Sequence, residues 1–113
     1  MKTQSAKAKG RRFQQWVRDK LIESLGIHPE DIESRSMGAS GEDLIMARSA
    51  REKFPYSVEC KNQERLNIWD SLEQAESNAN QHIPLLVFKR NRSKTYISME
   101  INDLIKILND KEK

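Results

Sequence analysis

The chain has 113 residues, of which 36% are hydrophobic and 33% are charged, and its formal net charge is +3 at pH 7. This length predicts a single domain over residues 1–113 with a modest core. No apolar run reaches membrane-spanning length, no signal peptide is visible, and the single Cys60 excludes both an intrachain disulfide and a cysteine metal site. We therefore expect an intracellular protein in a reducing environment, with no membrane partner.

Hydrophobic periodicity predicts a helix, three strands, a helix and a strand, followed by a C-terminal strand and helix. The helices are expected at residues 6–25, at 71–81 and from 102 onward, and the strands at 32–37, 42–47, 54–61, 85–88 and 94–99. Residues 48–53 are expected to form a charged turn, and residues 1–9 a basic, flexible extension. Asp70 and Asn102 are expected to cap the second and third helices.

Two tryptophans are expected to pack in the core. Trp16 lies on the apolar stripe of the first predicted helix, at helical spacing from Phe13. Trp69 follows a loop, and core packing is favoured for it over the two alternatives, which are stacking on a base and packing against a dimer partner.

A carboxylate, one spacer residue and a lysine end the third predicted strand. Because side chains alternate between the two faces of a strand, Glu59 and Lys61 point to one face and Cys60 points to the other. Asp43 supplies a second carboxylate at the start of the preceding strand. Two carboxylates and a lysine suit metal-assisted attack on a phosphodiester. The alternative interpretation of Glu59 and Lys61 is an ordinary ion pair on a half-exposed strand.

Two basic clusters flank this motif in the sequence, one near the N-terminus and one at a predicted hairpin tip. Their residues are Lys7, Lys9, Arg11 and Arg12 in the first, and Lys89, Arg90 and Arg92 in the second. Cationic clusters of this kind hold a polyanion through its backbone, which predicts DNA as the partner. The alternative is a charged chain end and a solvated hairpin tip with no partner.

Several segments resemble the PD-(D/E)xK nuclease superfamily, and the chain is most similar to small archaeal-type and phage Holliday-junction resolvases. The segments are Gly10-Arg11-Arg12-Phe13, residues 35–40, Asp43-Leu44-Ile45 and Val58-Glu59-Cys60-Lys61. The resemblance implies an α/β fold with an αβββαβ core, in which helices flank a mixed central sheet. It implies Mg²⁺ or Mn²⁺ at Asp43 and Glu59, with the Cys60 carbonyl oxygen as a further ligand. It also implies that Lys61 orients the attacking water or stabilises the pentacovalent phosphate.

The resemblance extends to three further positions. Relatives often carry a glutamate early in the first helix, where this chain has Gln14, whose neutral amide can contact a metal-bound water. Ser40 is implied to hydrogen-bond the scissile phosphate, and its alternative role is turn formation. Gln74 matches a polar helix residue that faces the site, and its alternative is a solvated helix face.

Two classes of function follow from these residues. The first is a metal-dependent DNA endonuclease that resolves branched DNA such as Holliday junctions, and paired incisions then predict a homodimer. The same chemistry would serve an endonuclease for flaps, nicks or single strands. The second class is a non-catalytic DNA-binding protein with this fold, which only Gln14 favours.

Overall fold

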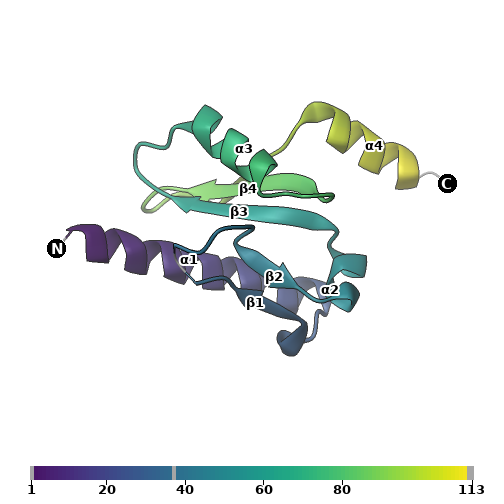
Figure 1. The fold of residues 1–113 in the computed structure, drawn as a ribbon, viewed down its shortest axis with the longest axis horizontal. Helices are drawn as coiled ribbons and strands as arrows, with labels where there is room; N and C mark the ends of the chain where they lie inside the picture. The colour runs from purple at the N-terminus through teal and green to yellow at the C-terminus, as the bar shows by residue number, and fades with distance from the viewer. Residues whose placement is uncertain (1, 37, 112–113) are drawn as a thin grey trace.

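Two helices cover opposite faces of a central three-stranded sheet (Figure 1). The structure is a computed structural model that describes residues 2–36 and 38–111. In chain order its elements are α1 (Lys2–Leu25), the 3₁₀ turn η1 (Pro29–Asp31), β1 (Ile32–Ser34), β2 (Leu44–Met46), α2 (Arg48–Lys53), β3 (Tyr56–Asn62), α3 (Ile68–Ser77), β4 (Ile83–Lys89), β5 (Tyr96–Ser98) and α4 (Ile101–Lys111). The predicted α/β class and order of the main elements are confirmed.

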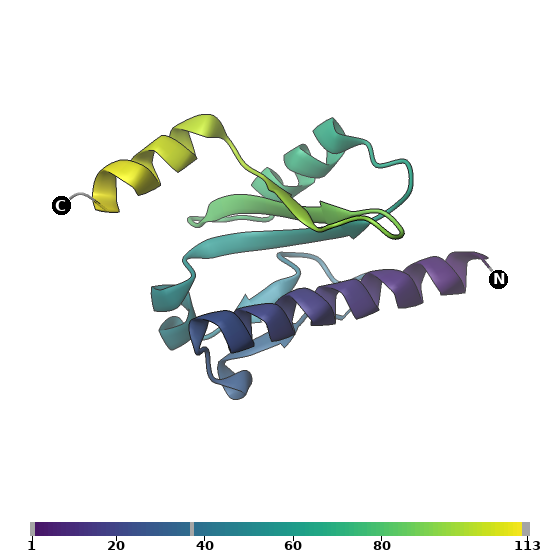
Figure 2. The same ribbon diagram turned by 180° about the vertical axis from the view of Figure 1, so that it is seen from behind.

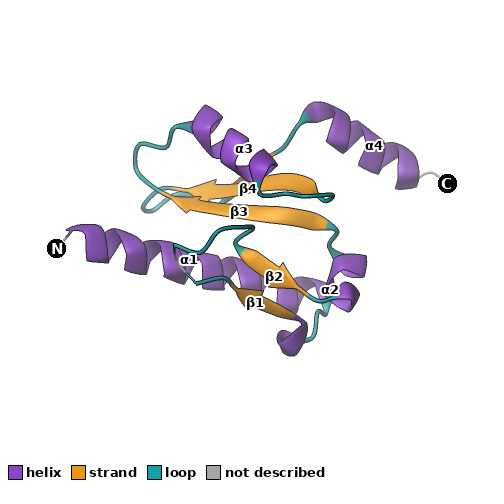
Figure 3. Ribbon diagram, in the orientation of Figure 1, coloured by secondary structure: helices purple, strands orange, loops and turns teal. Residues whose placement is uncertain are grey.

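The central sheet is mixed, as expected, but β1 and β2 form a separate ladder beside it (Figure 3). β3 and β4 pair in parallel from Tyr56 opposite Ile83 to Asn62 opposite Lys89, and β4 pairs antiparallel with β5. β1 and β2 pair antiparallel with each other. The backbone N–H of Asp43 donates to the carbonyl of Val58 over 2.9 Å, which ties the start of β2 to the middle of β3.

The apolar core lies between α1 and the face of the sheet that α1 covers. Phe13 and Val17 of α1 pack there with Val58 of β3 and Val87 of β4. Strand alternation places Glu59 on the other face, which α3 covers with small buried residues such as Ala75. The fold thus separates an apolar face of β3 from a face that carries charged side chains.

The structure corrects four local expectations about the elements. Residues 48–53 form the helix α2 rather than a turn, because Ala50 packs into the core. The helix α3 begins at Ile68, since Asn67 rather than Asp70 is its cap and accepts from the Asp70 N–H over 3.0 Å. Glu100, not Asn102, caps the helix α4.

The fourth correction is the N-terminal extension, which is continuous with the long helix α1 seen in Figure 2. The predicted strand at 32–37 ends at Ser34, and its last residue, Met37, lies outside the described residues. Within the described part of the chain, no helix combines the length and the apolarity that crossing a membrane would require.

Both tryptophans are exposed, so the expectation that they pack in the core was wrong. Trp16 is 48% exposed, because Phe13 and Val17 already fill the contact between α1 and the sheet, and its ring stacks beside Phe13. Trp69 is 76% exposed, because Ser71 and Ala75 are the α3 residues buried against the sheet.

Candidate active site

One cavity of about 290 Å³ gathers residues from α1, from the connection between β1 and β2, from β3 and from α3. Its walls include six of the residues predicted from the sequence, namely Gln14, Asp43, Glu59, Cys60, Lys61 and Gln74. Ser40 does not line this cavity, whereas Ser36, Gly38 and Ala39 of the same connection do. The fold therefore brings Gly10 and Gln74, which are 64 positions apart in the sequence, to the same cavity.

The strand β3 presents Glu59 and Lys61 side by side on one face. The Glu59 side chain is buried, with 3% of the residue exposed, and its Oε2 lies 3.8 Å from Nζ of Lys61. Its other oxygen accepts a hydrogen bond of 3.3 Å from the amide of Asn78, the residue that ends α3. Asn78 was not singled out from the sequence, because a polar residue after a helix is ordinarily no more than a cap.

Asp43 is held against β3 by its own backbone and by its carboxylate. Its Oδ2 accepts a hydrogen bond of 2.6 Å from the backbone N–H of Cys60. Its N–H donates to Val58, two residues earlier on β3. These two bonds fix the Asp43 carboxylate beside Glu59 without help from a flexible side chain.

Gln14 anchors the connection between β1 and β2 from inside the molecule. Its Nε2 lies 2.9 Å from Oγ of Ser34, 2.7 Å from the carbonyl oxygen of Arg35 and 2.8 Å from that of Asp43. Carbonyl oxygens only accept hydrogen bonds, so the NH₂ group of the amide must face them. Sequence reasoning assigned Gln14 a contact with metal-bound water and missed this bracing of the two strand ends.

Arg35 and Gly41 fix the conformation of the rest of the connection between β1 and β2. Gly41 has φ of +104°, and a Cβ there would lie 3.1 Å from the guanidinium carbon of Arg35. Nε of Arg35 donates to the carbonyl of Glu42 over 2.6 Å. A side chain at position 41 would therefore disturb the bond that holds the segment leading into Asp43.

Negative charge exceeds positive charge in the cavity. Burial, followed by the neighbouring Asp43, raises the pKa of Glu59 to about 7, and the Asn78 amide and Lys61 offset only part of this. Burial also raises the pKa of Asp43, against the opposing effects of the Cys60 N–H, Lys61 and Arg35. Two carboxylates that repel each other in a desolvated site are stabilised by a bound cation.

The donor set fits a hard divalent cation with an open coordination sphere. Mg²⁺ is commonly bound by one or two carboxylates, with water and substrate phosphate completing its shell. Across residues 2–36 and 38–111, no third His, Cys, Asp or Glu side chain joins a pair to make a closed metal cluster. Asp43 and Glu59 could therefore supply two carboxylates to such an ion, and its other coordination positions would have to come from other ligands.

The two predicted basic clusters meet in space, although 77 positions separate Arg12 from Lys89. Lys9, Arg12 and Trp16 of α1 and Lys89 and Lys94 near the β4–β5 hairpin line one groove of about 600 Å³. We call these five residues the basic groove. Gln14 and Gly10 line the active-site cavity instead, so the groove and the cavity lie on different flanks of α1.

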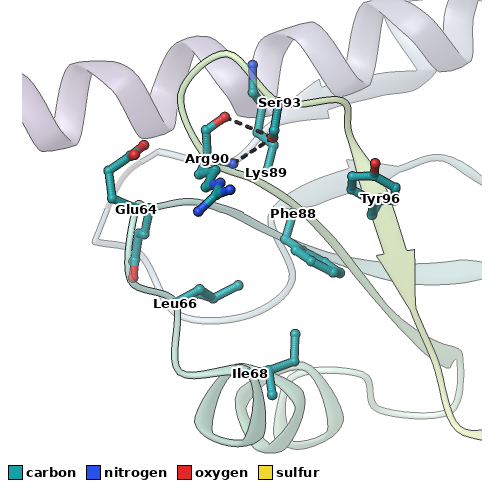
Figure 4. A pocket seen from close by; sticks show the side chains of 9 residues that line it. Glu64, Leu66, Ile68, Phe88, Lys89, Arg90, Ser93 and Tyr96 are labelled. Carbon is teal, nitrogen blue, oxygen red and sulfur yellow. Dashed lines mark hydrogen bonds between the residues drawn. The ribbon is translucent and has the colours of Figure 1, made fainter.

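The remaining predicted DNA-binding residues lie outside this groove. Arg90 lines a neighbouring pocket of about 430 Å³ together with Glu64, Phe88 and Tyr96 (Figure 4). Lys7, Arg11 and Arg92 are exposed and line neither hollow. Arg92 has φ of +64°, which places it at the tight turn of the hairpin.

Comparison with known proteins supports a nuclease. No curated protein and no solved structure gives a significant match to this chain. Residues 5–113 match the model of a family described as "Phage putative PDDEXK endonuclease". This match runs from Ser5, near the start of α1, through α4, and the matched range contains the acidic pair and the lysine that line the cavity. The chain therefore belongs to this PD-(D/E)xK endonuclease family.

Proposed function

We propose that the protein is a metal-dependent endonuclease that hydrolyses phosphodiester bonds in branched DNA. The observation that carries this proposal is the cavity in which Asp43 and Glu59 are desolvated beside each other with Lys61 on the same strand face. A structural ion pair needs only one carboxylate. A second, repelling carboxylate in the same cavity is explained by a cation that both of them bind.

The residues of the chain divide the chemistry between them. Asp43 and Glu59, with the Cys60 carbonyl, would hold Mg²⁺ or Mn²⁺, which polarises a phosphate oxygen and makes bound water more acidic. Lys61 lies where its ammonium group can orient the attacking water and stabilise charge on the phosphate. Water adds to phosphorus, one P–O ester bond breaks, and the departing oxygen takes up a proton. Gln14 and Asn78 position the two carboxylates.

A branched substrate is supported by the placement of the cationic residues. The basic groove lies on a different flank of α1 from the cavity, so the chain can hold DNA at a second place while it cuts. A four-way junction offers several arms, and its symmetric resolution needs two active sites, which supports a homodimer. We place the protein with its DNA inside the cell, in the cytoplasm or nucleoid.

A flap or single-strand endonuclease is the second candidate. The exposed Trp16 in the basic groove favours it, because aromatic side chains stack on unpaired bases. The chemistry at Asp43, Glu59 and Lys61 would be the same for either substrate.

Cleavage of a panel of labelled DNAs tests the proposal. Purified protein is incubated with four-way junctions, flaps, single strands and linear duplex, with Mg²⁺, Mn²⁺, Ca²⁺ or excess chelator. We expect junction cutting with Mg²⁺ and Mn²⁺, binding with little turnover with Ca²⁺, and none with chelator. Strong cutting in chelator would overturn the metal site. Preference for flaps or single strands would favour the second candidate, and binding of DNA without cutting would favour a non-catalytic protein.

A further inference from the structure

The C-terminal helix α4 extends away from the body of the molecule (Figures 1 and 2), and the aliphatic side chains on one side of it are exposed. Its aliphatic residues recur at helical spacings of three and four, and each is between 42% and 67% exposed. These residues are Ile101, Leu104, Ile105 and Leu108, which we call the α4 stripe. Within residues 2–36 and 38–111, α4 has no buried residue and no extensive contact with another element.

Such a helix needs a partner to be stable. An isolated helix shorter than roughly 12–15 residues is marginal in water, and α4 has 11 residues. Most of the stability of a protein helix comes from packing its apolar face. The α4 stripe therefore indicates a surface that another molecule covers.

We infer that α4, together with the adjacent strand β5, forms an interface with a second copy of this chain. Ile97 of β5 is 62% exposed, and β5 is the edge strand of the β3-β4-β5 sheet. An edge strand offers unpaired backbone N–H and C=O groups to a neighbour. Strand and helix are joined by only two residues, Met99 and Glu100, so they form one continuous surface in the chain.

The charges of α4 favour a second copy over DNA or a membrane surface as the partner that covers the α4 stripe. The polar positions of the helix carry Asp103 and Asp110 against Lys106 and Lys111, so they sum to zero. A helix that binds DNA presents an excess of cations, and one that lies on a membrane surface is rich in Lys and Arg. A neutral helix presents neither excess, and it meets a copy of itself without net repulsion.

The family match also favours a second copy over an unrelated protein. The match continues through residue 113, so α4 belongs to the domain that the family shares. A second copy is the one partner that is present wherever the chain itself is made. A two-fold interface is also the commonest arrangement of soluble homo-oligomers.

The size of the surface predicts a weak dimer. A standard interface removes roughly 800 Å² from each partner, and a helix of 11 residues is only about 16 Å long. The α4 stripe alone falls short of this area, so β5 must contribute. We expect dissociation in the micromolar range, with DNA raising the share of dimer when two copies bind one substrate.

Sedimentation equilibrium of the full chain, without DNA and without metal, tests the inference apart from nuclease activity. The average mass should rise toward twice the chain mass as concentration increases to several hundred micromolar. Leu104→Lys should weaken association by at least about tenfold, since it places a charge in an apolar contact. Lys106→Gln, on the polar side of α4, is the matched control and should leave association unchanged. A monomer at every concentration would overturn the inference.

Two measurements guard against a variant that simply fails to fold. In the wild-type chain, hydrogen exchange of residues 101–111 should slow as concentration rises, because docking protects the helix. Exchange that does not depend on concentration would overturn the inference. In addition, Leu104→Cys or Ile105→Cys should form a disulfide-linked homodimer on oxidation, and Lys106→Cys should not. Cross-linking through Lys106→Cys alone would place the interface on the other side of α4.

Discussion

Two buried carboxylates face the same side of β3 and have opposite surroundings. Glu42 is 6% exposed and forms an ion pair with Arg51, while its other oxygen accepts a hydrogen bond of 3.2 Å from Ser57. Glu59, two residues along β3 from Ser57, is 3% exposed and has a lysine at 3.8 Å and a second carboxylate as its neighbours. The charge of Glu42 is compensated within the fold, whereas the charge of Glu59 is compensated only in part.

A buried carboxylate with a purely structural role is expected to have its charge compensated by neighbouring donors, and Glu42 meets this expectation better than Glu59 does. A guanidinium offers several N–H donors in a fixed plane and satisfies a buried carboxylate fully. Arg51 also donates to the carbonyl of Tyr56 over 2.9 Å, so the Glu42 cluster closes the start of β3 against α2. The Asp43 and Glu59 pair keeps negative charge that Lys61 offsets only in part, and a bound cation would compensate the remainder.

Substitutions in the two groups of residues should differ most in their effect on the rate of DNA cleavage. Asp43→Asn, Glu59→Gln and Lys61→Ala should each reduce cleavage by about a thousandfold or more, since each removes a ligand or a charge that acts in the transition state. DNA binding should persist in the Asp43→Asn and Glu59→Gln variants, because removing a carboxylate reduces repulsion of phosphate. Cleavage and affinity are measured on one labelled junction. Glu42→Gln is the control, and at the same concentration of folded protein its cleavage rate should lie within about tenfold of that of wild type. A Glu59→Gln variant with a cleavage rate in that range would refute the proposed active site.

The ion pair of Glu42 and Arg51 should contribute to the free energy of unfolding, which is the second expected difference between the two groups of residues. Arg51→Ala should destabilise the fold by about 3 kcal/mol, because Glu42 is left buried without its counter-charge. Urea unfolding measures the loss. The Glu42→Gln/Arg51→Ala double variant should lose less than the sum of the two single variants, since it leaves no unpaired charge. Additive losses would show that the ion pair does not couple the two residues.

The sequence indicated the two candidate catalytic carboxylates better than it indicated the ion pair of Glu42. Strand alternation predicted that Glu59 and Lys61 share a face, because a period of two is fixed by backbone geometry. Asp43 was singled out by its place at the start of another predicted strand, and the resemblance supported it, but its bonds to Val58 and Cys60 join segments that local propensity does not relate. The same holds for Glu42 with Arg51, where a run of charged residues looked like a turn and proved to be a helix.

Contacts between residues that are distant in the sequence explain the other differences between prediction and structure. Periodicity marked Trp16 as apolar, but it could not show that Phe13 and Val17, rather than Trp16, pack into the core. Gln14 looked like a weakened metal ligand, and three hydrogen-bond acceptors from 20 to 29 residues away give it a structural role as well. Contacts of this range depend on the complete fold, which a pattern along the chain does not contain.

The third effect is a gain in stability at the proposed metal site. The pKa of Glu59 is raised from 4.5 to about 7, so the folded chain binds this proton more tightly than the unfolded chain. The free energy of unfolding therefore falls as pH rises from about 4.5 to about 7. Above that range the ionised carboxylate destabilises the folded chain by its full amount. In chelator at pH 8, Glu59→Gln should stabilise the protein by about 1 kcal/mol after allowance for solvent screening.

Thermal unfolding of Glu59→Gln and wild type at several pH values tests this sign. The advantage of the variant should shrink as the pH is lowered toward 5, where wild-type Glu59 is protonated. Added Mg²⁺ or Mn²⁺ should raise the unfolding temperature of wild type more than that of the variant. A variant that is less stable than wild type at pH 8 would mean that Glu59 is compensated in the way that Glu42 is.

The smallest effect concerns the cationic residues that surround the two clusters. Lys9 and Lys89 face the basic groove from two elements, whereas Arg92 is exposed at the hairpin turn. Each lysine that contacts a phosphate contributes up to about one unit to the log–log dependence of affinity on salt. Lys9→Gln/Lys89→Gln should therefore flatten that dependence and weaken binding equally for DNAs of different sequence, because contacts to phosphate carry no sequence information. Affinity measured against salt, with Arg92→Gln as the control, gives the comparison. An unchanged slope in the double variant would place the bound DNA away from the groove and leave its lysines as solvated surface charge.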